Sequence, residues 1–468
     1  EISWVSNIGH AVKTFLRGEI TPPSHEWWSQ VSGDYAYGVD VEVENWWEKA
    51  PTAPYLWSIG FSDGVHRDAD YIFRYPPKKL GHGLTEGIPV FHNAPYDVPW
   101  IEAYTGMPIP KWHDTLIEAH ILGYAPLALK GLMPVLLGGD HSTFYEIAGT
   151  AAKPIPYDSH PEEMLDYNSK DAWGSMTLHT EVFQPEIKRR GLQPLIDKTY
   201  EVSRVLIDMR KQGIPVSQER LVWLRKEMLR DMIPAQRIIQ AAGIEPDDQN
   251  GMRKLFWAGK TKVVTSPRSG QLSLKGKVLY DNAEESQKEL VNAWIKYHSN
   301  DKFISTYVDN WRHKEWLHPW LNQTGTATWR FSSSKPNLQN VPKNAGAKLY
   351  QVFVAPEGYT FVSLDYSQIE LRLLANLVAM HTNDTSLRDL YLRGEDMHDN
   401  TSKLEAIQTT AKLLGMKPRD VSKRFNFGVI YGISEKGLES QFGIPEQQGI
   451  QILDQFANKH PGVQQYVE

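Results

Sequence analysis

The chain has 468 residues and a mass of 53.4 kDa, which at about 100 to 200 residues per domain indicates two to four domains. Hydrophobic residues make up 41% and charged residues 23%, as in a folded protein, and no apolar run approaches the roughly 18 residues of a membrane span. The absence of cysteine excludes disulfides, thiolate metal sites and cysteine nucleophiles, and the formal charge of -6 argues mildly against a polyanion as partner. Because the N-terminus has no basic segment followed by an apolar one, we expect a cytoplasmic protein that is neither secreted nor membrane-bound.

The first part of the chain, residues 33–185, alternates short strand-like runs with helical stretches, which is an α/β pattern. The strand-like runs are residues 35–39, 55–61 and 88–91. From about residue 190 to 315 helical patterns with charged faces dominate, interrupted by a polar segment at 259–276. Residues 318–380 return to strand and helix, and residues 387–468 read as helices. The sequence therefore predicts an α/β multidomain protein with boundaries near residues 187, 317 and 385.

Four carboxylates and a tyrosine occur in the first part of the chain. Asp40 and Glu42 end an apolar run, and strand geometry places residues two apart on the same face. Asp97 follows a second apolar run, and Tyr167 and Asp171 are four apart, which places them on one side of a helix. This set is sufficient for a two-metal centre that hydrolyses phosphodiesters, because acidic oxygen ligands suit Mg²⁺ or Mn²⁺. The tyrosine is available to orient the attacking water.

Each of these signals is weak by itself, since an Asp-x-Glu pair usually marks a solvated strand edge. Their order and context resemble the three exonuclease motifs of the DEDD superfamily, in the variant with a tyrosine in the third motif. The resemblance covers about residues 33–185 and includes His92-Asn93 before Asp97 and the segment His113-Asp114-Thr115. It implies an RNase H-like domain that removes nucleotides from DNA in the 3'-to-5' direction. Its catalytic residues and metal ligands would then be Asp40, Glu42, Asp97 and Asp171, with Tyr167 as a further catalytic residue.

A second constellation starts at Asp365. The hydrophobic residues 361–364 predict a strand that ends at Asp365, and Ile369, Leu373 and Leu377 recur at helical spacing behind it. At this junction between strand and helix, the Asp365 carboxylate and the Tyr366 carbonyl beside it would be accessible to a metal ion. The carboxylate would not be buried as an unpaired charge.

One predicted helix runs from cations to aromatic side chains. Arg419, Lys423, Phe427 and Tyr431 are spaced by four, so they share a face, and a nucleoside triphosphate has the same polarity. The two cations would hold phosphates near a helix start at Pro418, and the two aromatic residues would meet sugar and base. The alternative for the aromatic residues alone is a core stripe.

The segments SLDYSQIELR and PRDVSKRFNFGVIYG are very similar to motifs A and B of family A DNA polymerases, the bacterial DNA polymerase I family, and SSKPNLQNVP and QVFVAPEGY match in the same order. The resemblance implies that Asp365 binds catalytic Mg²⁺ (or Mn²⁺), with Tyr366 lending its backbone carbonyl. Glu370 would pair with Tyr431 and exclude ribonucleotides. His398 would join the triphosphate site, the alternative being a surface histidine. The implied residues that bind the dNTP substrate are Tyr366, Gln368, Glu370, His398, Arg419, Lys423, Phe427 and Tyr431.

The same resemblance implies that Arg330, Gln339 and Asn340 donate to the minor groove of primer-template DNA, where acceptors common to every base pair allow geometry to be checked without reading sequence. Asn337 has either that role or a structural one. Trp329 stands where the family usually has a glycine. This departure affects the expected backbone conformation and the expected minor-groove role of Arg330. The helical stretch before this region resembles the family's thumb, which grips the DNA backbone.

The family's third polymerase motif, His-Asp-Glu, does not occur in this sequence, so the palm is expected to be incomplete. We expect a C-terminal fragment or a second polypeptide to complete it, and negligible polymerisation by this chain alone. The predicted domains are an N-terminal extension (1–32), an exonuclease domain (33–187), a thumb (188–317), the first part of the palm (318–385) and the fingers (386–468). The predicted function is template-directed DNA synthesis with 3'-to-5' proofreading. The alternative is a 3'-to-5' DNA exonuclease whose polymerase portion only binds DNA.

Overall fold

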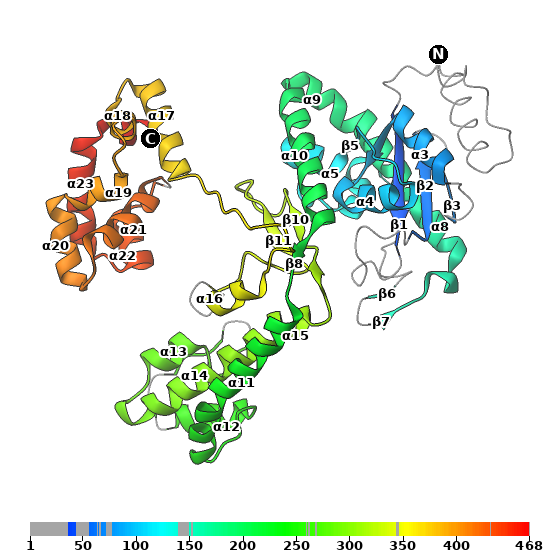
Figure 1. Ribbon diagram of the computed structural model, residues 1–468. Helices are drawn as coiled ribbons and strands as arrows, with labels where there is room; N and C mark the ends of the chain where they lie inside the picture. Colours follow the sequence, from blue (N-terminus) through cyan, green and yellow to red (C-terminus); the bar gives the residue numbers. More distant parts are fainter. Residues whose placement is uncertain are drawn as a thin grey trace. The chain divides into compact units, whose positions relative to one another are not determined.

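The computed structural model describes residues 36–43, 56–62, 64, 67–71, 77–138, 149–150, 153–258, 260, 263–266, 269–342, 346–430 and 432–467. The chain divides into two compact units, one ending at Tyr359 and the other starting at Thr360 (Figure 1). This division falls inside the stretch predicted as palm. The predicted N-terminal extension lies outside the described residues.

The first unit is built on a five-stranded mixed sheet with the order β3-β2-β1-β4-β5. Strands β1, β2 and β3 are antiparallel, whereas β4 and β5 run parallel to β1. The predicted strand runs are confirmed at β1, β2 and β4, whose inward side chains are almost all buried. The bounds are β1 Ala36–Glu42, β2 Ser58–Ser62, β3 Arg67–Tyr71, β4 Ile88–Phe91 and β5 His113–Asp114.

Helices pack on this sheet and bury its apolar core, in which Trp100 and Phe91 are fully buried. Helix α8 lies along β1 and β2, as Figure 1 shows. A second apolar cluster around Phe183 joins α5, α6, η4, α9 and α10, and Trp173 of α8 packs against it. The helices of this part are α3 Pro77–Glu86, α4 Ala94–Thr105, α5 Thr115–Leu122, α6 Leu129–Leu136, the short η3 Tyr157–Ser159, α8 Pro161–Thr177, the π-helical η4 Leu178–Phe183, α9 Gln184–Arg190 and α10 Gln193–Gln212. A two-stranded ribbon joins β6 Gly149–Thr150 to β7 Lys153–Pro154.

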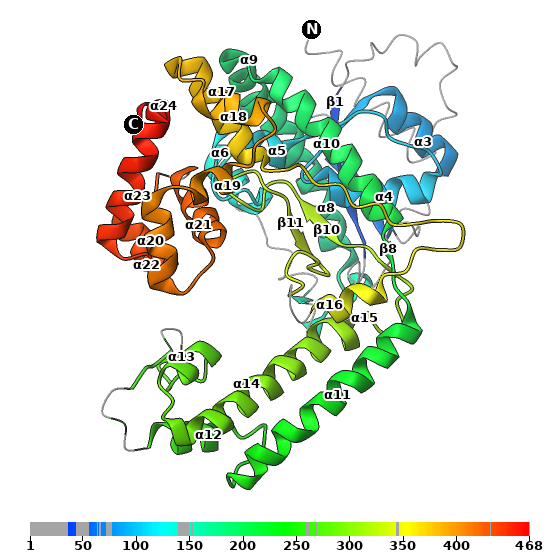
Figure 2. The ribbon, with the colours of Figure 1, turned by 60° about the vertical axis from the view of Figure 1, so that its left-hand side comes forward.

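The helical stretch that follows contains two long helices, α11 and α14, which lie side by side (Figure 2). They confirm the helices predicted at 219–242 and 284–300, and Trp294 and Ile239 are buried between them and the smaller helices. The helices are α11 Gln218–Ala241, α12 Gln249–Trp257, α13 Gly276–Asp281, η5 Glu285–Gln287, α14 Lys288–Phe303, η6 Ile304–Val308 and α15 Asp309–Trp311. Short antiparallel pairs join β8 Ile214–Pro215 to β9 Trp316–Leu317 and β10 Trp320–Asn322 to β11 Ser332–Ser334, before α16 Gly346–Leu349 and η7 Tyr350–Val352.

The predicted strand at residues 361–364 is wrong. These residues are extended but have no strand partner among the described residues, and Leu364 is 90% exposed. A strand requires a neighbour for its backbone hydrogen bonds, and hydrophobicity alone does not supply one.

The second unit is otherwise helical, as predicted. Its core gathers around Phe425 and Phe456, whose rings meet edge to face with centroids 5.3 Å apart. The helices are α17 Ile369–Thr382, α18 Ser386–Leu392, α19 Met397–Ser402, α20 Glu405–Leu414, α21 Pro418–Ile430, α22 Glu435–Phe442, α23 Glu446–Lys459 and α24 Pro461–Val467. Across the described residues of both units, none of the helices combines the length and apolarity needed to span a membrane.

Candidate functional site

Strand β1 carries the first two acidic residues. Asp40 pairs with Gly60 and Glu42 with Ser58 across β1 and β2, so the two carboxylates leave the same face of the sheet. Glu42 is buried and Asp40 is partly buried. The spacing of two residues in a strand therefore places this pair as the sequence predicts.

Asp97 is brought to the same face by helix α4. The backbone N–H of Val41 donates a 3.2 Å hydrogen bond to Asp97 Oδ1, so this carboxylate lies against β1 at the residue that separates Asp40 from Glu42 in sequence. Asp114 fixes the start of α4, because its carboxylate accepts from the backbone N–H groups of Asn93 and Ala94 at 2.9 and 2.8 Å. The same side chain caps α5, as expected for a structural segment.

Helix α8 supplies the tyrosine and the fourth carboxylate. Tyr167 and Asp171 are both buried on the side of α8 that faces the sheet. Asn168, which the sequence analysis did not single out, donates from Nδ2 to Asp40 Oδ2 at 2.7 Å and accepts from Ser58 at 3.1 Å. It ties α8 to both strands.

Two glycines allow α8 to approach the sheet so closely. A Cβ atom at Gly38 would lie 2.0 Å from the backbone oxygen of Ala172, and one at Gly60 would lie 2.7 Å from that of Asn168. These contacts are too short for any other residue, so glycine sets the distance between the carboxylates of β1 and those of α8.

The four carboxylates share one electrostatic environment. Burial raises the pKa of Asp40 well above its ordinary value, and the charge of Asp171 raises it further. The pKa of Glu42 is raised by burial and then by Asp40 and Asp171, and that of Asp97 by burial and by Asp40. Burial and the same acidic neighbours also raise the pKa of Tyr167, so the phenol is neutral near pH 7.

This donor set fits divalent cations. Ionising all four carboxylates costs free energy, because their negative charges repel one another and raise one another's pKa. Divalent cations that prefer oxygen ligands, such as Mg²⁺ or Mn²⁺, would relieve this repulsion. Asp40, Glu42, Asp97 and Asp171 would hold them. The convergence joins three chain segments, β1, α4 and α8, and its first and last residues, Asp40 and Asp171, are 131 positions apart.

Lys130 is a further residue of this site that the sequence did not reveal. It lies on α6, outside the three motifs, and its ammonium forms an ion pair with Asp171. Its Nζ also lies 4.0 Å from the centroid of the Tyr167 ring. A lysine in a helical pattern about 40 residues before its partner carries no signal that would have identified it.

A second group of three possible metal ligands lies in the described residues, and two of the three are joined by hydrogen bonds. His113, Glu118 and His179 offer ligand atoms within 4.8 Å of one another. His179 contacts Glu118 at 2.9 Å, and Tyr200 donates to Glu118 at 2.9 Å. This network fastens α10 to α5.

In the second unit, the predicted cationic residues begin α21 as expected, with Pro418 as its first residue. Arg419 is held by two carboxylates, with Nε 2.6 Å from Asp399 and a terminal nitrogen 3.1 Å from Asp396. Asp396 also accepts from Gln368 at 2.6 Å, so it joins the start of α17 to the start of α21. Sequence analysis missed both carboxylates, although Asp396 lies in the segment that contains His398.

The remaining predicted nucleotide ligands differ in burial. His398 is 5% exposed and its ring contacts Asn426, so the alternative of a surface histidine is wrong. Burial lowers the pKa of His398. Phe427 is 47% exposed, which argues against a core stripe at this position, and Lys423 is partly buried one turn before it. Tyr431 lies outside the described residues, and so does its predicted pairing with Glu370.

Asp365 and Tyr366 lie in the unpaired extended segment before α17, and Tyr366 is 80% exposed. The stripe of Leu373 and Leu377 predicted behind them is on the exposed face of α17, together with Met380. The buried face of α17 is formed instead by Leu371, Leu374, Ala375 and Val378.

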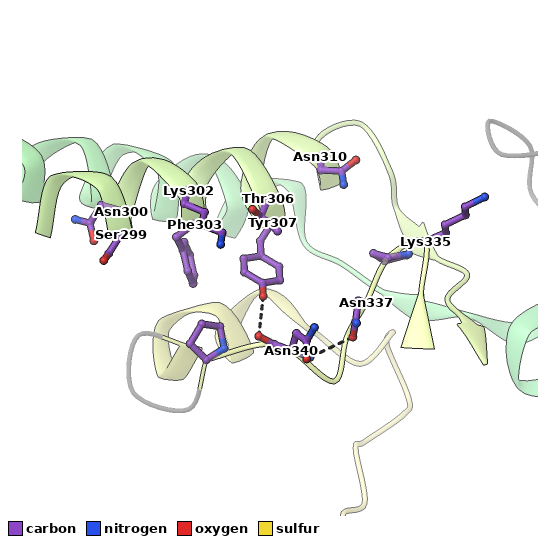
Figure 3. Close-up of a pocket in the computed structure, with 12 residues that line it drawn as sticks. Ser299, Asn300, Lys302, Phe303, Thr306, Tyr307, Asn310, Lys335, Asn337 and Asn340 are labelled. Atoms are coloured by element: carbon purple, nitrogen blue, oxygen red, sulfur yellow. Dashed lines mark hydrogen bonds between the residues drawn. The ribbon is translucent and has the colours of Figure 1, made fainter. Parts of the chain in front are cut away.

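Of the residues predicted to bind DNA, Asn340 lines a hollow of about 770 Å³ between α14 with η6 and the loop 335–342, together with Asn337 (Figure 3). The side chain of Gln339 instead donates to the Phe331 carbonyl at 3.0 Å. Tyr307 donates to the Asn340 carbonyl at 2.8 Å. Asn337 Oδ1 accepts from the backbone N–H groups of Gln339 and Asn340, which supports the structural alternative for Asn337. Lys302 and Asn310 line the same hollow.

Trp329 keeps a glycine-like backbone despite its side chain, with φ of 60° in the left-handed region. Its ring packs on His120 of α5 with centroids 4.3 Å apart. Arg330 follows it on the exposed side, and its carbonyl accepts from Thr326 at 2.8 Å. The departure from glycine therefore changes the side-chain contacts more than the local backbone.

Residues 235–468 match the family model of DNA polymerase family A. A DNA polymerase I from Pseudomonas aeruginosa is 30% identical over 445 residues, which cover 88% of this chain and 46% of the relative. One from Chloroflexus aurantiacus is 32% identical over 403 residues, covering 81% and 41%, and the thermostable enzyme of Thermus filiformis is 31% identical over 333 residues, covering 67% and 39%.

The fold is similar to that of the POL domain of Pol1 from M. smegmatis, a structure in complex with DNA primer-template and dNTP. The TM-score is 0.72 at 20% identity, covering 94% of this chain and 76% of that chain. The fold is thus that of a mixed α/β, helix-rich polymerase domain. The chain belongs to family A of the DNA polymerases, and it spans less than half the length of the curated relatives named above.

Proposed function

We propose that the first part of the chain is a 3'-to-5' exonuclease that proofreads DNA. The convergence of Asp40, Glu42, Asp97 and Asp171 on one face of the sheet carries this proposal. The sheet order, with three antiparallel strands followed by two parallel ones, supports an RNase H-like domain. Bound Mg²⁺ or Mn²⁺ would activate water and stabilise the leaving oxygen.

The chain's own residues would orient the substrate end in this site. Neutral Tyr167 can donate a hydrogen bond to the attacking water or to the phosphate, because its phenol keeps its proton near pH 7. Asn168 holds Asp40 in one orientation, and the Val41 N–H holds Asp97. Glu42, Asp97 and Asp171 are buried, so little of their surface is in contact with bulk water.

We further propose that the chain takes part in template-directed DNA synthesis, with primer-template DNA and dNTP as substrates. Membership of family A supports this proposal. Within it, Asp365 and the Tyr366 carbonyl would bind metal, and the nucleotide would contact Gln368, Glu370, His398, Arg419, Lys423, Phe427 and Tyr431. Arg330, Gln339 and Asn340 would contact the duplex.

The polymerase site would be completed by a C-terminal segment or a second polypeptide. The exposed apolar residues at 361–364 and on the outer face of α17 support this, since exposed apolar side chains that neighbour one another favour association with a partner surface. The alternative function, a DNA exonuclease whose polymerase portion only binds DNA, rests on the same exonuclease site.

Two assays separate these functions. With a 3'-labelled single strand and Mg²⁺, Asp40→Ala combined with Glu42→Ala should abolish excision and leave DNA binding unchanged, and continued excision would refute the metal assignment. With primer-template and dNTPs, the chain by itself should show negligible extension, and addition of a family A C-terminal palm fragment should restore it. Excision without extension in both conditions would favour the alternative.

A further inference from the structure

Lys130 lies at the proposed exonuclease site and makes one contact more than an ion pair with Asp171 would need. Its ammonium reaches Asp171 from α6 and at the same time lies over the ring of Tyr167, so it contacts both residues of the third motif. The side chain of Lys130 is 19% exposed, so its neighbours do not enclose it completely. Its charge also acts on Asp40 and Glu42, lowering pKa values that burial and neighbouring carboxylates raise.

The charge balance of the site shows what this ammonium can and cannot do. One lysine offers a single positive charge to four carboxylates, and three of their pKa values remain raised in its presence. Lys130 therefore compensates Asp171 only in part, and a divalent cation that binds Asp171 would compete with it for the same oxygen. An ammonium on a flexible four-carbon stem can move without moving the backbone.

The incoming substrate offers such an ammonium a new partner. A phosphodiester that enters the site adds a negative charge close to Tyr167, and a lysine released from Asp171 would lie within reach of its oxygens. We propose that Lys130 is an exchangeable counter-ion: it neutralises Asp171 in the metal-free chain and transfers its ammonium to the substrate phosphate when divalent cations take Asp171. This inference rests on the proposed exonuclease function.

Three variants test the inference, all in the full chain. Lys130→Met removes the charge and keeps most of the side-chain volume, Lys130→Gln removes the charge and keeps a hydrogen-bond donor, and Lys130→Arg keeps the charge. Lys170→Met is the matched control, because Lys170 lies beside Asp171 in sequence but its ion pair is with Asp166. Thermal unfolding of each variant checks that it folds, and Lys130→Gln serves if Lys130→Met does not.

The first readout is binding of Mn²⁺ without DNA, followed by electron paramagnetic resonance of the free ion. Loss of the competing ammonium should tighten the weakest Mn²⁺ site about tenfold in Lys130→Met, a factor that corresponds to about 1.4 kcal/mol. Lys130→Arg and Lys170→Met should bind Mn²⁺ as the wild type does. An ion pair with a purely structural role would lower the unfolding temperature without tightening the metal site.

The second readout is binding of a single-stranded oligonucleotide in Ca²⁺, where hydrolysis is suppressed. Loss of one phosphate contact should reduce the slope of log K against log salt by about 0.7 in Lys130→Met and leave it unchanged in Lys170→Met. Excision in Mg²⁺ should then fall about 10- to 100-fold in Lys130→Met and be largely retained in Lys130→Arg.

The outcomes distinguish the two levels of the argument. If the wild type neither binds Mn²⁺ nor excises nucleotides, the proposed exonuclease function fails, and the role of Lys130 fails with it. If the wild type does both while Lys130→Met matches it in Mn²⁺ affinity and salt slope, the exonuclease stands and the exchangeable counter-ion is refuted.

Discussion

Gly38→Ala is the substitution whose effect the structure determines most directly. The new Cβ would lie 2.0 Å from the backbone oxygen of Ala172, and real Cβ atoms essentially never approach another heavy atom within 3.0 Å. Because both partners are backbone or Cβ atoms, neither can rotate away, and α8 must retreat from β1 by about 1 Å (3.0 minus 2.0 Å). Asp171 would retreat with it from Asp40.

The magnitude follows from how sharply phosphodiester chemistry depends on position. A displacement of about 1 Å costs about 100-fold in rate, and overpacking of this kind costs about 1 to 3 kcal/mol of stability. Gly60→Ala should be milder, since its Cβ would meet the Asn168 oxygen at 2.7 Å. Gly276→Ala is the matched control, because its Cβ would make an ordinary 3.4 Å contact with Ile295 in α14.

The assay is the rate of excision from a 3'-labelled single strand in saturating Mg²⁺, together with the free energy of unfolding in urea. We expect the rate to fall in the order Gly276→Ala, Gly60→Ala, Gly38→Ala, with the control equal to the wild type. A Gly38→Ala protein that folds and excises at the wild-type rate would show that the spacing of α8 and β1 does not set the geometry of the site.

Three further predictions concern stability and pH. Burial alone would raise the pKa of Glu102, but hydrogen bonds from Arg204 and Lys211 outweigh it and hold that pKa below its ordinary value. The ionised Glu102 therefore stabilises the folded protein above the unfolded pKa of about 4.3, and this stabilisation is lost as the pH falls through the folded pKa. Glu102→Gln should therefore be less stable by about 1 to 3 kcal/mol at pH 7 in urea unfolding, with a difference that shrinks in acid; a constant difference would contradict the assignment. Trp329→Ala and Trp329→Gly lose the same ring, but glycine accepts the φ of 60° at no cost, so the glycine variant should be more stable by about 1 kcal/mol, and equal unfolding temperatures would argue against the left-handed backbone. Tyr200→Phe removes a hydrogen bond to buried Glu118 and should cost about 1 to 3 kcal/mol, whereas an unchanged unfolding midpoint would show that the network is dispensable.

The sequence predicted local features of the proposed exonuclease site well because they depend on backbone periodicity. The spacing of two between Asp40 and Glu42 and of four between Tyr167 and Asp171 matches a strand and a helix in the structure. The position of Asp97 could not be predicted from periodicity, because it depends on where α4 lies, which the Asp114 carboxylate helps to fix. The resemblance to known motifs supplied that step.

The residues that the sequence did not reveal act across long separations. Lys130 meets Asp171 from 41 positions away, and Asp396 meets Arg419 from 23 positions away. No local pattern marks either contact. The close approach of α8 to the sheet likewise depends on Gly38. In a sequence pattern, a glycine inside a strand only lowers the strand propensity and does not indicate which element packs against it.

The incorrect strand at residues 361–364 has a different origin. Its hydrophobic pattern is what a strand buried on both faces would show, yet Val362 and Leu364 are exposed. The hydrophobic pattern indicates that the segment could be buried in a sheet. A strand also needs backbone hydrogen bonds to a neighbouring strand, and the described residues do not provide one here. His398 shows the converse, since an isolated polar residue proved to be buried against Asn426.

The central claim is that four carboxylates from β1, α4 and α8 gather two divalent cations. Counting bound Mn²⁺ by electron paramagnetic resonance, for the wild type and for a variant that combines Asp40→Ala, Glu42→Ala and Asp171→Ala, tests it most directly. We predict that the wild type binds about two more ions per chain than the variant. Equal stoichiometry in two folded proteins would contradict the account.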